Sequence, residues 1–515
     1  MASNEIIMGM AASTLGTPVA DASDLTLGPS GTAYETVIGL EVHVELATKS
    51  KLFCSCANES GAEQNTHVCP ACCGMPGMLP VTNKRVVELG MTAGMMLHCH
   101  INRTTTFDKK SYYYPDLPAS YQTTQWFAPV AVNGHVTIQT ENGPKDIRIK
   151  QIHMEEDAGK LVHDNFTYTT LVDFNRTSVP LIEIVSQPDL RSADEVVAYL
   201  ERLRDLMRFA KVSGARMEKG TMRCDVNLSV RPAGSDVLGV RTEMKNMASI
   251  AAIQRAIAYE TERHIRAIEE GTEELVQETR GWDDDAGKSF SMRTKETAGD
   301  YRYFPDPNLM PVVIDDEWYD RIQASLPELP EKKLERYVSE IGLSDYDAGL
   351  LVQSRAFCDC FEGAMEAGAA PKEAANWIIT NCAGVLNKRG LTSEDLPVPG
   401  SALGQLIGLV DDGKVSSANG KRLLETLFDL AARGEEIPTD MAAFAEAEGL
   451  VNSSDTGALE AVIAAVIAAD PETAQAYRDG REKALNPLFG ACMKELKGKC
   501  DTQVLRELLI AELKK

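Results

Sequence analysis

Three ionisable side chains alternate with apolar residues in the stretch 37–45, which reads VIGLEVHVE. This period of two predicts a strand with one buried face, and it places Glu41, His43 and Glu45 in a single row. A divalent cation would relieve the repulsion between the carboxylates and keep the imidazole neutral. An ordinary solvated strand face is the alternative, and this stretch alone does not decide between them.

Three later segments carry acidic groups that could complete such a site. The segment 152–160, IHMEEDAGK, holds three successive acids and is either an exposed turn or the other half of a metal cluster. Glu183 lies inside the apolar run LIEIV, where a lone acid is usually functional or paired. In MEKGTMRCDVNLSV, Arg223, Asp225 and Asn227 alternate with apolar residues, which predicts a second polar strand face.

Two close cysteine pairs follow the first strand. They are Cys54-Ser-Cys56 and Cys69-Pro-Ala-Cys72, separated by a short polar connection. Four thiolates with this spacing can occupy the corners of a tetrahedron, which predicts a structural zinc site. Free or redox-active thiols are the alternative, and Cys73 or His67 could replace one ligand.

The segment 107–122, FDKKSYYYPDLPASYQ, combines tyrosines, prolines and two lysines. This composition suits an irregular loop that lines a pocket, where Lys110 could meet a carboxylate or a phosphate. A packed surface loop fits the composition equally well.

Length and charge limit the class of protein. A chain of 515 residues is expected to form two to four domains. A formal net charge of −24 argues against extensive nonspecific binding to nucleic acid or anionic membrane. We expect a cytoplasmic protein with reduced cysteines, because the sequence shows no signal or transit peptide and no run of eighteen apolar residues.

The chain divides by composition into four predicted regions. Residues 1–33 are rich in small residues, contain no Lys or Arg, and are expected to be a disordered extension. Residues 34–325 alternate strand patterns with helices that begin near Ser192 and Ile250. Residues 326–434 favour helix, and residues 435–515 are expected to form a helical tail whose basic end could contact a phosphate backbone. A charged, solvated helix is the alternative for this end.

Six stretches in series resemble the motifs of the B subunit family of tRNA-dependent amidotransferases. They are GLEVHVEL, FDKKSYYYPDLP, HMEEDAGK, DFNRTSVPLIEIVS, RCDVNLSV and DYRYFPDPNLMP. The resemblance implies an α+β protein, with an antiparallel-sheet catalytic cradle, an all-helical domain and a small helical tail domain. It implies ATP-dependent conversion of misacylated Glu-tRNA(Gln) or Asp-tRNA(Asn) to the amide, through phosphorylation of the side-chain carboxylate.

The resemblance also implies roles for individual residues. It assigns catalysis to Glu41, His43, Lys110, Glu156 and Asp225, and magnesium binding to Glu41, His43, Glu156, Glu183 and Asp225. It assigns tRNA binding to Lys494, Lys497 and Lys499. Alternation allows only one of Glu155 and Glu156 to face the metal, and the family pattern favours Glu156.

The sequence contains no amidase motif and no recognisable glutaminase site, so a partner must supply ammonia. The resemblance implies an amidase-type A subunit and a small C subunit in a heterotrimer, with ATP, Mg and Zn as ligands. A zinc-stapled tRNA-binding subunit without catalysis is one alternative, although it does not explain two acidic strand faces. A metal-dependent hydrolase is another, and it does not explain the basic tail.

Overall fold

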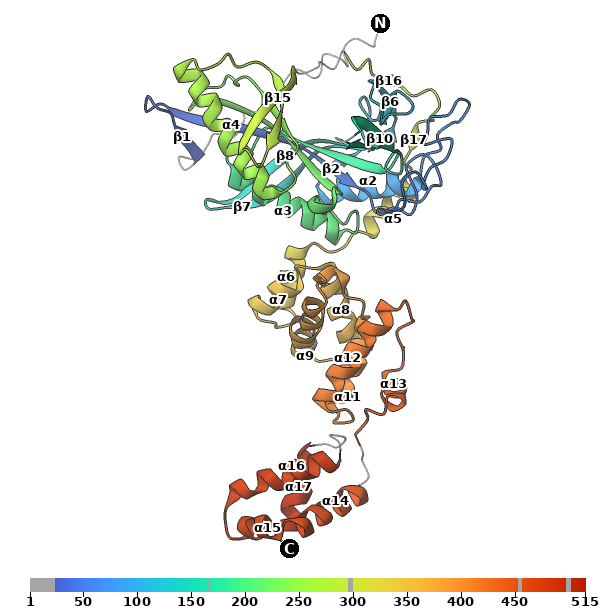
Figure 1. Cartoon of the computed structure of the whole chain (residues 1–515), viewed down its shortest axis with the longest axis vertical. Helices are drawn as coiled ribbons and strands as arrows, with labels where there is room; N and C mark the ends of the chain where they lie inside the picture. The colour runs from blue at the N-terminus through green and yellow to red at the C-terminus, as the bar shows by residue number, and fades with distance from the viewer. Residues whose placement is uncertain (1–23, 165–166, 295–299, 453–455, 497–501) are drawn as a thin grey trace. The chain divides into compact units, whose positions relative to one another are not determined.

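The computed structural model describes residues 24–164, 167–294, 300–452, 456–496 and 502–515. The chain forms two compact units, residues 1–327 and residues 328–515. The first contains all the sheets and the second is helical (Figure 1). Within the described residues, no helix is long and apolar enough to span a membrane.

A 10-stranded sheet forms the centre of the first unit, in the order β15-β14-β13-β12-β2-β11-β8-β7-β3, with β1 paired to β2. Its strands are β1 (Leu25–Leu27), β2 (Ala33–Glu45), β3 (His100–Ile101), β7 (Ala131–Thr140), β8 (Gly143–Glu156), β11 (Pro180–Ser186), β12 (Met222–Pro232), β13 (Thr242–Lys245), β14 (Glu278–Asp283) and β15 (Lys288–Thr294). All pairs are antiparallel except β13 with β14. The expected antiparallel cradle is therefore a mixed sheet with one parallel pair, because α4 crosses over between β13 and β14.

Smaller sheets flank this centre. They contain β4 (Thr104–Thr105) with β17 (Val312–Val313), β9 (Lys160–Asp164) with β10 (Thr169–Asp173), and β5 (Asp108–Ser111) between β6 (Tyr121–Thr124) and β16 (Phe304–Pro305). The predicted tyrosine-rich loop is therefore partly strand, in β5 and β6.

One face of the large sheet is covered by α2 (Lys84–Met96), α3 (Ala193–Phe209) and α4 (Ile250–Glu270) (Figure 1). Both predicted helix starts are confirmed, since Ser192 and Ser249 accept hydrogen bonds from backbone N–H groups of the first turn. The apolar row of β2, including Leu40 and Val42, is buried on this face. The alternate residues, including Glu41 and His43, therefore point to the opposite face.

The extension predicted to be disordered contains structure in its last part. Leu25–Leu27 forms β1 and pairs with the first residues of β2. The Glu269 carboxylate accepts hydrogen bonds from the Ser30 backbone N–H at 2.8 Å and from its hydroxyl at 2.5 Å. The prediction is wrong for residues 24–33 because strand pairing and α4 hold them, whereas residues 1–23 lie outside the described residues.

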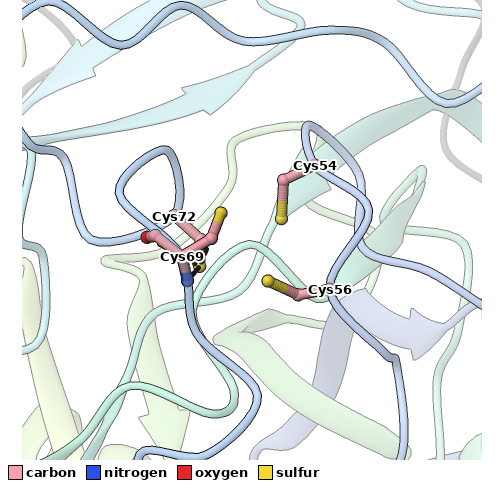
Figure 2. A group of neighbouring side chains, drawn as sticks. All are labelled: Cys54, Cys56, Cys69 and Cys72. Atoms are coloured by element: carbon pink, nitrogen blue, oxygen red, sulfur yellow. Dashed lines mark hydrogen bonds between the residues drawn. The ribbon is translucent and has the colours of Figure 1, made fainter.

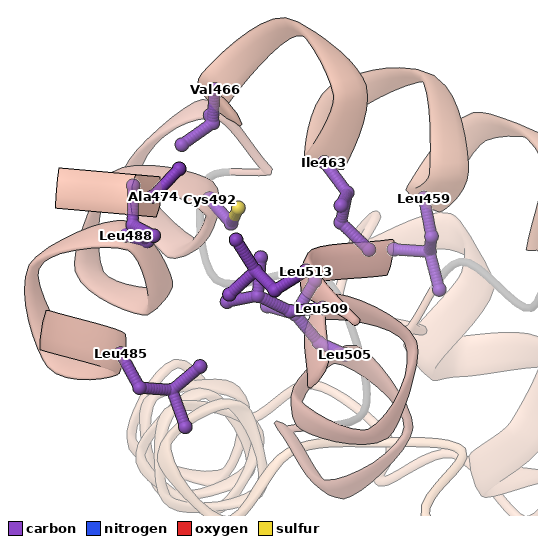
Figure 3. Packing of buried hydrophobic residues seen from close by; sticks show 10 residues of the cluster. All are labelled: Leu459, Ile463, Val466, Ala474, Leu485, Leu488, Cys492, Leu505, Leu509 and Leu513. Atoms are coloured by element: carbon purple, nitrogen blue, oxygen red, sulfur yellow. The ribbon is translucent and has the colours of Figure 1, made fainter. Parts of the chain in front are cut away.

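The helices after the large sheet are α5 (Asp316–Ala324), α6 (Pro330–Ser339), α7 (Asp345–Leu351), α8 (Arg355–Glu366), α9 (Pro371–Asn376), α10 (Ala383–Lys388), α11 (Gly400–Asp411), α12 (Ser417–Ala432), α13 (Met441–Ala447), α14 (Thr456–Ala469), α15 (Pro471–Arg478), α16 (Leu485–Glu495) and α17 (Thr502–Leu513). The last four share a separate apolar core that includes Leu459, Leu488 and Leu509 (Figure 3). By contrast, α13 packs beside α11, where the Gln405 side chain accepts a hydrogen bond from the Met441 N–H at 3.1 Å. The tail core thus begins near residue 456, later than the expected boundary at 435.

Candidate active site

The open face of the large sheet brings polar residues from distant segments into register. Glu41 lies opposite Asp225 of β12, and His43 lies opposite Glu183 of β11. Glu183 in turn lies opposite His153 of β8. These residues line a cavity of about 990 Å³.

The first cluster in the cavity consists of His43, Glu155 and Glu183, with His153 beside it. Nε2 of His43 lies 3.3 Å from a carboxylate oxygen of Glu155 and 3.9 Å from one of Glu183. Nε2 of His153 lies 2.6 Å from the same oxygen of Glu183. Each of the three cluster residues can offer a ligand atom within 4.8 Å of the others, so the cluster can hold a cation.

Opposite charges in this cluster shift the pKa of each member toward its charged form. Burial opposes protonation of His43, but the charge of Glu183 and the hydrogen bond to Glu155 raise its pKa to about 9. The same competition raises the pKa of His153 to about 10. Against the effect of burial, the two histidines hold the pKa of Glu155 well below its usual value and lower that of Glu183 to about 2. A divalent cation could replace this extra positive charge.

The second cluster contains Glu41, Asp225 and Glu243, whose carboxylate oxygens lie within 4.8 Å of one another. The Lys245 ammonium pairs with Asp225 and lies 3.0 Å from a Glu243 oxygen. Burial and the charges of Glu183 and Glu243 raise the pKa of Glu41. Three carboxylates close to one another, two of them paired with the Lys245 ammonium, form a second place that suits a cation, here with oxygen ligands only.

Glu155, and not Glu156, faces the cavity. The Glu156 carboxylate accepts a hydrogen bond from the Thr123 N–H at 2.9 Å and lines a smaller cavity of about 150 Å³ beside Cys72. The expectation that Glu156 joins the acidic site is corrected by the geometry of β8. The apolar residues change from odd to even positions between Ile149 and Ile152, where the pairing with β11 shifts by one residue. The alternation therefore places Glu155 on the polar face.

Lys110 lines the large cavity together with aromatic side chains. Its Nζ lies 5.4 Å from the ring centre of Tyr112 and 4.8 Å from that of Tyr301. Trp126 stacks on Tyr303 with ring centres 4.4 Å apart, and both side chains also line this cavity. Three arginines also line the cavity: Arg176, Arg223 and Arg241. Their guanidinium groups are suited to contact an anionic substrate.

The four cysteines of the two predicted pairs converge (Figure 2). Their sulfurs all lie within 4.8 Å of one another, and those of Cys69 and Cys72 are 3.8 Å apart. Two ligands on a tetrahedral zinc with Zn–S bonds of about 2.3 Å are roughly 3.8 Å apart, so the spacing fits the metal. None of the four forms a disulfide bond. His67 and Cys73 do not belong to this group of mutually close ligands.

The three predicted tRNA-contacting lysines are only partly described. Lys494 is exposed in the last turn of α16. Lys497 and Lys499 lie outside the described residues.

Sequence reasoning did not assign two members of the clusters, Glu155 and Glu243, or the neighbouring His153. His153 and Glu155 could have been found from the two apolar residues Ile152 and Met154, which alternate with them. No local signal identifies Glu243, because its position depends on the pairing of β13 with β12.

The large sheet thus carries a cavity in which two acidic clusters lie beside cationic side chains. Two family descriptions match the chain: the GatB/GatE catalytic domain over residues 36–320 and the GatB domain over residues 359–513. The chain belongs to this GatB family.

Full-length relatives support the same assignment. The B subunit of the aspartyl/glutamyl-tRNA(Asn/Gln) amidotransferase of Caldicellulosiruptor bescii is 46% identical over 94% of this chain and 99% of its own length. The relative of the same name from Agathobacter rectalis is 46% identical over 93% of this chain and 99% of its own length. The relative from Brevibacillus brevis, again of the same name, is 43% identical over 92% of this chain and 98% of its own length.

Proposed function

We propose that this chain is the B subunit of a glutamine-dependent tRNA amidotransferase. It acts on misacylated Glu-tRNA(Gln), Asp-tRNA(Asn) or both, and it works in the cytoplasm. The observation that carries the proposal is the pairing of two carboxylate clusters, His43–Glu155–Glu183 and Glu41–Asp225–Glu243, on one sheet face in a chain of this family.

The reaction has two steps in the large cavity. An oxygen of the substrate's side-chain carboxylate attacks the γ-phosphorus of ATP, and the bond from that phosphorus to ADP breaks. Ammonia then attacks the acyl carbon, inorganic phosphate leaves, and the nitrogen loses a proton. Both steps require positioning and positive charge more than a protein nucleophile.

The residues of the cavity fit these demands. His43, Glu155 and Glu183 would hold one magnesium ion, and Glu41, Asp225 and Glu243 offer a second place for one. When bound, magnesium supplies charge neutralisation for the phosphate oxygens. Lys110 and the arginines on the cavity wall bind and orient the anionic substrate groups.

Ammonia comes from a partner in this proposal. An amidase-type A subunit hydrolyses glutamine, and a small C subunit completes the heterotrimer. The exposed Lys494 and the basic residues after it contact the tRNA backbone. The four cysteines bind zinc, which supports the fold and takes no part in the chemistry, because a site with four thiolate ligands has no open position.

A reconstitution tests the proposal. The full chain is combined with A and C subunits, glutamine, ATP, Mg and each misacylated tRNA in turn. We expect amidated aminoacyl-tRNA and ADP with at least one tRNA, and neither product without this chain. Binding of tRNA without ADP or amide formation would favour the non-catalytic alternative and overturn the proposal.

Two neighbouring glutamates offer a sharper comparison. Glu155→Gln removes a carboxylate charge from the first cluster, so we expect at least a hundredfold loss of kcat for amide formation, about 3 kcal/mol of barrier. Glu156→Gln keeps the acceptor for the Thr123 N–H, and we expect less than a threefold change. The measurement is ATP-dependent amidation by the reconstituted complex. Equal losses in the two variants would contradict the assignment of the cavity face.

A further inference from the structure

Lys51 is completely buried beside the cysteine cluster. Its side chain has no solvent exposure, and its Nζ donates to the Cys72 sulfur at 3.7 Å and to the Phe174 carbonyl at 3.3 Å. Among the described residues, no carboxylate forms an ion pair with it. A buried ammonium without a carboxylate partner is costly unless another negative charge lies close by.

The cysteine cluster would provide that charge. Four thiolates around a divalent ion carry a net charge of −2, which also needs compensation in a buried position. Lys51 lies on the side of the cluster where Cys72 is buried, and Cys54, Cys56 and Cys69 are only partly buried. We infer that Lys51 is a positioning residue that neutralises part of the charge of a metal-loaded cysteine site and ties this site to the wall of the catalytic cavity.

The segment between Cys56 and Cys69 links the cysteine site to the cavity wall. Five hydrogen bonds dock this connection on residues 172–175, through Glu63, Asn65 and His67. The Phe174 carbonyl that accepts from Lys51 also accepts from the Thr177 N–H, closing a tight turn. The cysteine site therefore fixes the conformation of this turn.

The turn carries Arg176 into the large cavity. Its guanidinium donates to the carbonyl groups of Ala158 and Gly159 at 2.9 and 2.7 Å and lies 3.6 Å from Asp157. Asp157 also accepts from Arg223 at 2.8 Å. Lys51 thus connects the metal site to a pair of arginines that line the cavity.

This inference rests on the proposed zinc site, and the first experiment separates the two. Full-length wild type, Lys51→Met, Lys51→Arg and the exposed control Lys49→Met are loaded with zinc and titrated with a chelator, and bound zinc is measured by mass spectrometry. We expect Lys51→Met to bind zinc about tenfold to a hundredfold more weakly than wild type, so that a weaker chelator removes the zinc. Changes of this size are typical when a residue that contacts a metal ligand is replaced. Lys51→Arg and Lys49→Met should lie near wild type.

Two outcomes overturn the inference in different ways. If wild type binds no zinc, the proposed metal site does not exist and the role inferred for Lys51 is contradicted as well. If wild type binds zinc and Lys51→Met retains it equally well, the site stands and Lys51 has no part in it.

The stability of Lys51→Met with and without zinc tests whether Lys51 acts through the metal site or only through packing. Lys51→Met should be less stable than wild type with zinc and no less stable after zinc removal, because the buried ammonium then has no metal site to neutralise. Loss of stability of equal size in both states contradicts the inference. If Lys51→Met does not fold, Lys51→Gln takes its place in the same comparison.

Hydrogen exchange tests the tie to the cavity. In zinc-loaded wild type, the amides of residues 172–179 should be protected, and chelation should increase their exchange. Zinc-loaded Lys51→Met should show the increased exchange without chelation. Protection of this segment that responds to neither change would contradict the connection.

Discussion

A single shift in strand pairing decides which glutamate enters the site. Glu155 and Glu156 are neighbours of the same type, yet one joins two histidines in the large cavity and the other caps a backbone N–H in a smaller one. The reversal follows from the irregular pairing near Ile149, after which even positions face the helices. The register shift in β8 therefore decides which of the two glutamates faces the large cavity.

His264 of α4 provides a pH-dependent prediction at this scale. It is buried, and its Nε2 lies 2.9 Å from the Thr242 hydroxyl. Burial, together with Arg263 and Arg280, lowers its pKa from 6.5 to about 3, although a Glu260 oxygen lies 3.6 Å away. The unfolded chain therefore binds a proton between these two pH values that the folded chain does not bind. Stability is present above pH 6.5 and is lost as the pH falls toward 3.

The variant His264→Gln should remove this contribution. Urea denaturation of the full chain, followed by tryptophan fluorescence, is compared at several pH values from 6.5 down to 3. Over this range we expect the free energy of unfolding of wild type to fall more steeply than that of the variant, by up to about 1.4 kcal/mol per pH unit. Parallel curves would show that His264 does not set the acid sensitivity.

At the scale of elements, glycine determines how closely α8 and α11 approach. A Cβ at Gly404 would lie 2.5 Å from the Ala364 carbonyl oxygen and 2.8 Å from the Ala367 Cβ. Four residues later in the same helix, a Cβ at Gly408 would meet no atom within 4 Å. The two positions form a matched pair, because both are helical and differ in their neighbours.

We expect opposite effects of alanine at these two positions. Gly404→Ala should lower the free energy of unfolding by about 1–3 kcal/mol, since the helices must separate. Gly408→Ala should raise it by up to about 1 kcal/mol through helix propensity. Chemical denaturation of the full chain measures both. A neutral Gly404→Ala would mean that the helices adjust without cost.

At the scale of the whole molecule, an acidic chain must bind a polyanion through a local surface. Residues 435–475 contain nine acids and no Lys or Arg, whereas residues 478–515 contain nine basic residues and six acids. Lys494 is exposed in α16, one of the four helices, α14 to α17, that share the tail core. The family resemblance implies that this end binds tRNA, and the local reversal of charge is compatible with contact to a phosphate backbone.

Charge reversal at Lys494 tests this prediction. Lys494→Glu should weaken tRNA binding several-fold at low salt and reduce the salt dependence of the binding constant, because phosphate contacts release counterions. The exposed Lys288→Glu in β15 carries the same charge change and should have little effect. Titration of labelled tRNA against the full chain at several salt concentrations measures both. Equal losses of tRNA affinity in the two variants would show that the net charge of the chain, and not a contact at Lys494, controls tRNA binding.

Patterns in the sequence determined those features that depend on neighbouring residues. The polar row of β2, the two cysteine pairs and the starts of α3 and α4 follow from alternation, close spacing and serine caps. These features are local, because a strand or helix imposes its own period on the side chains.

Only the tertiary structure decided which distant residues meet. The division of the acids into two clusters depends on pairing between β2, β8, β11, β12 and β13, and the entry of Glu155 depends on an irregular pairing. The place of Lys51 depends on the docking of the cysteine segment against residues 172–175. Such contacts join residues far apart in the chain, and register across a sheet is set by the packing of the whole buried face, not by any one strand.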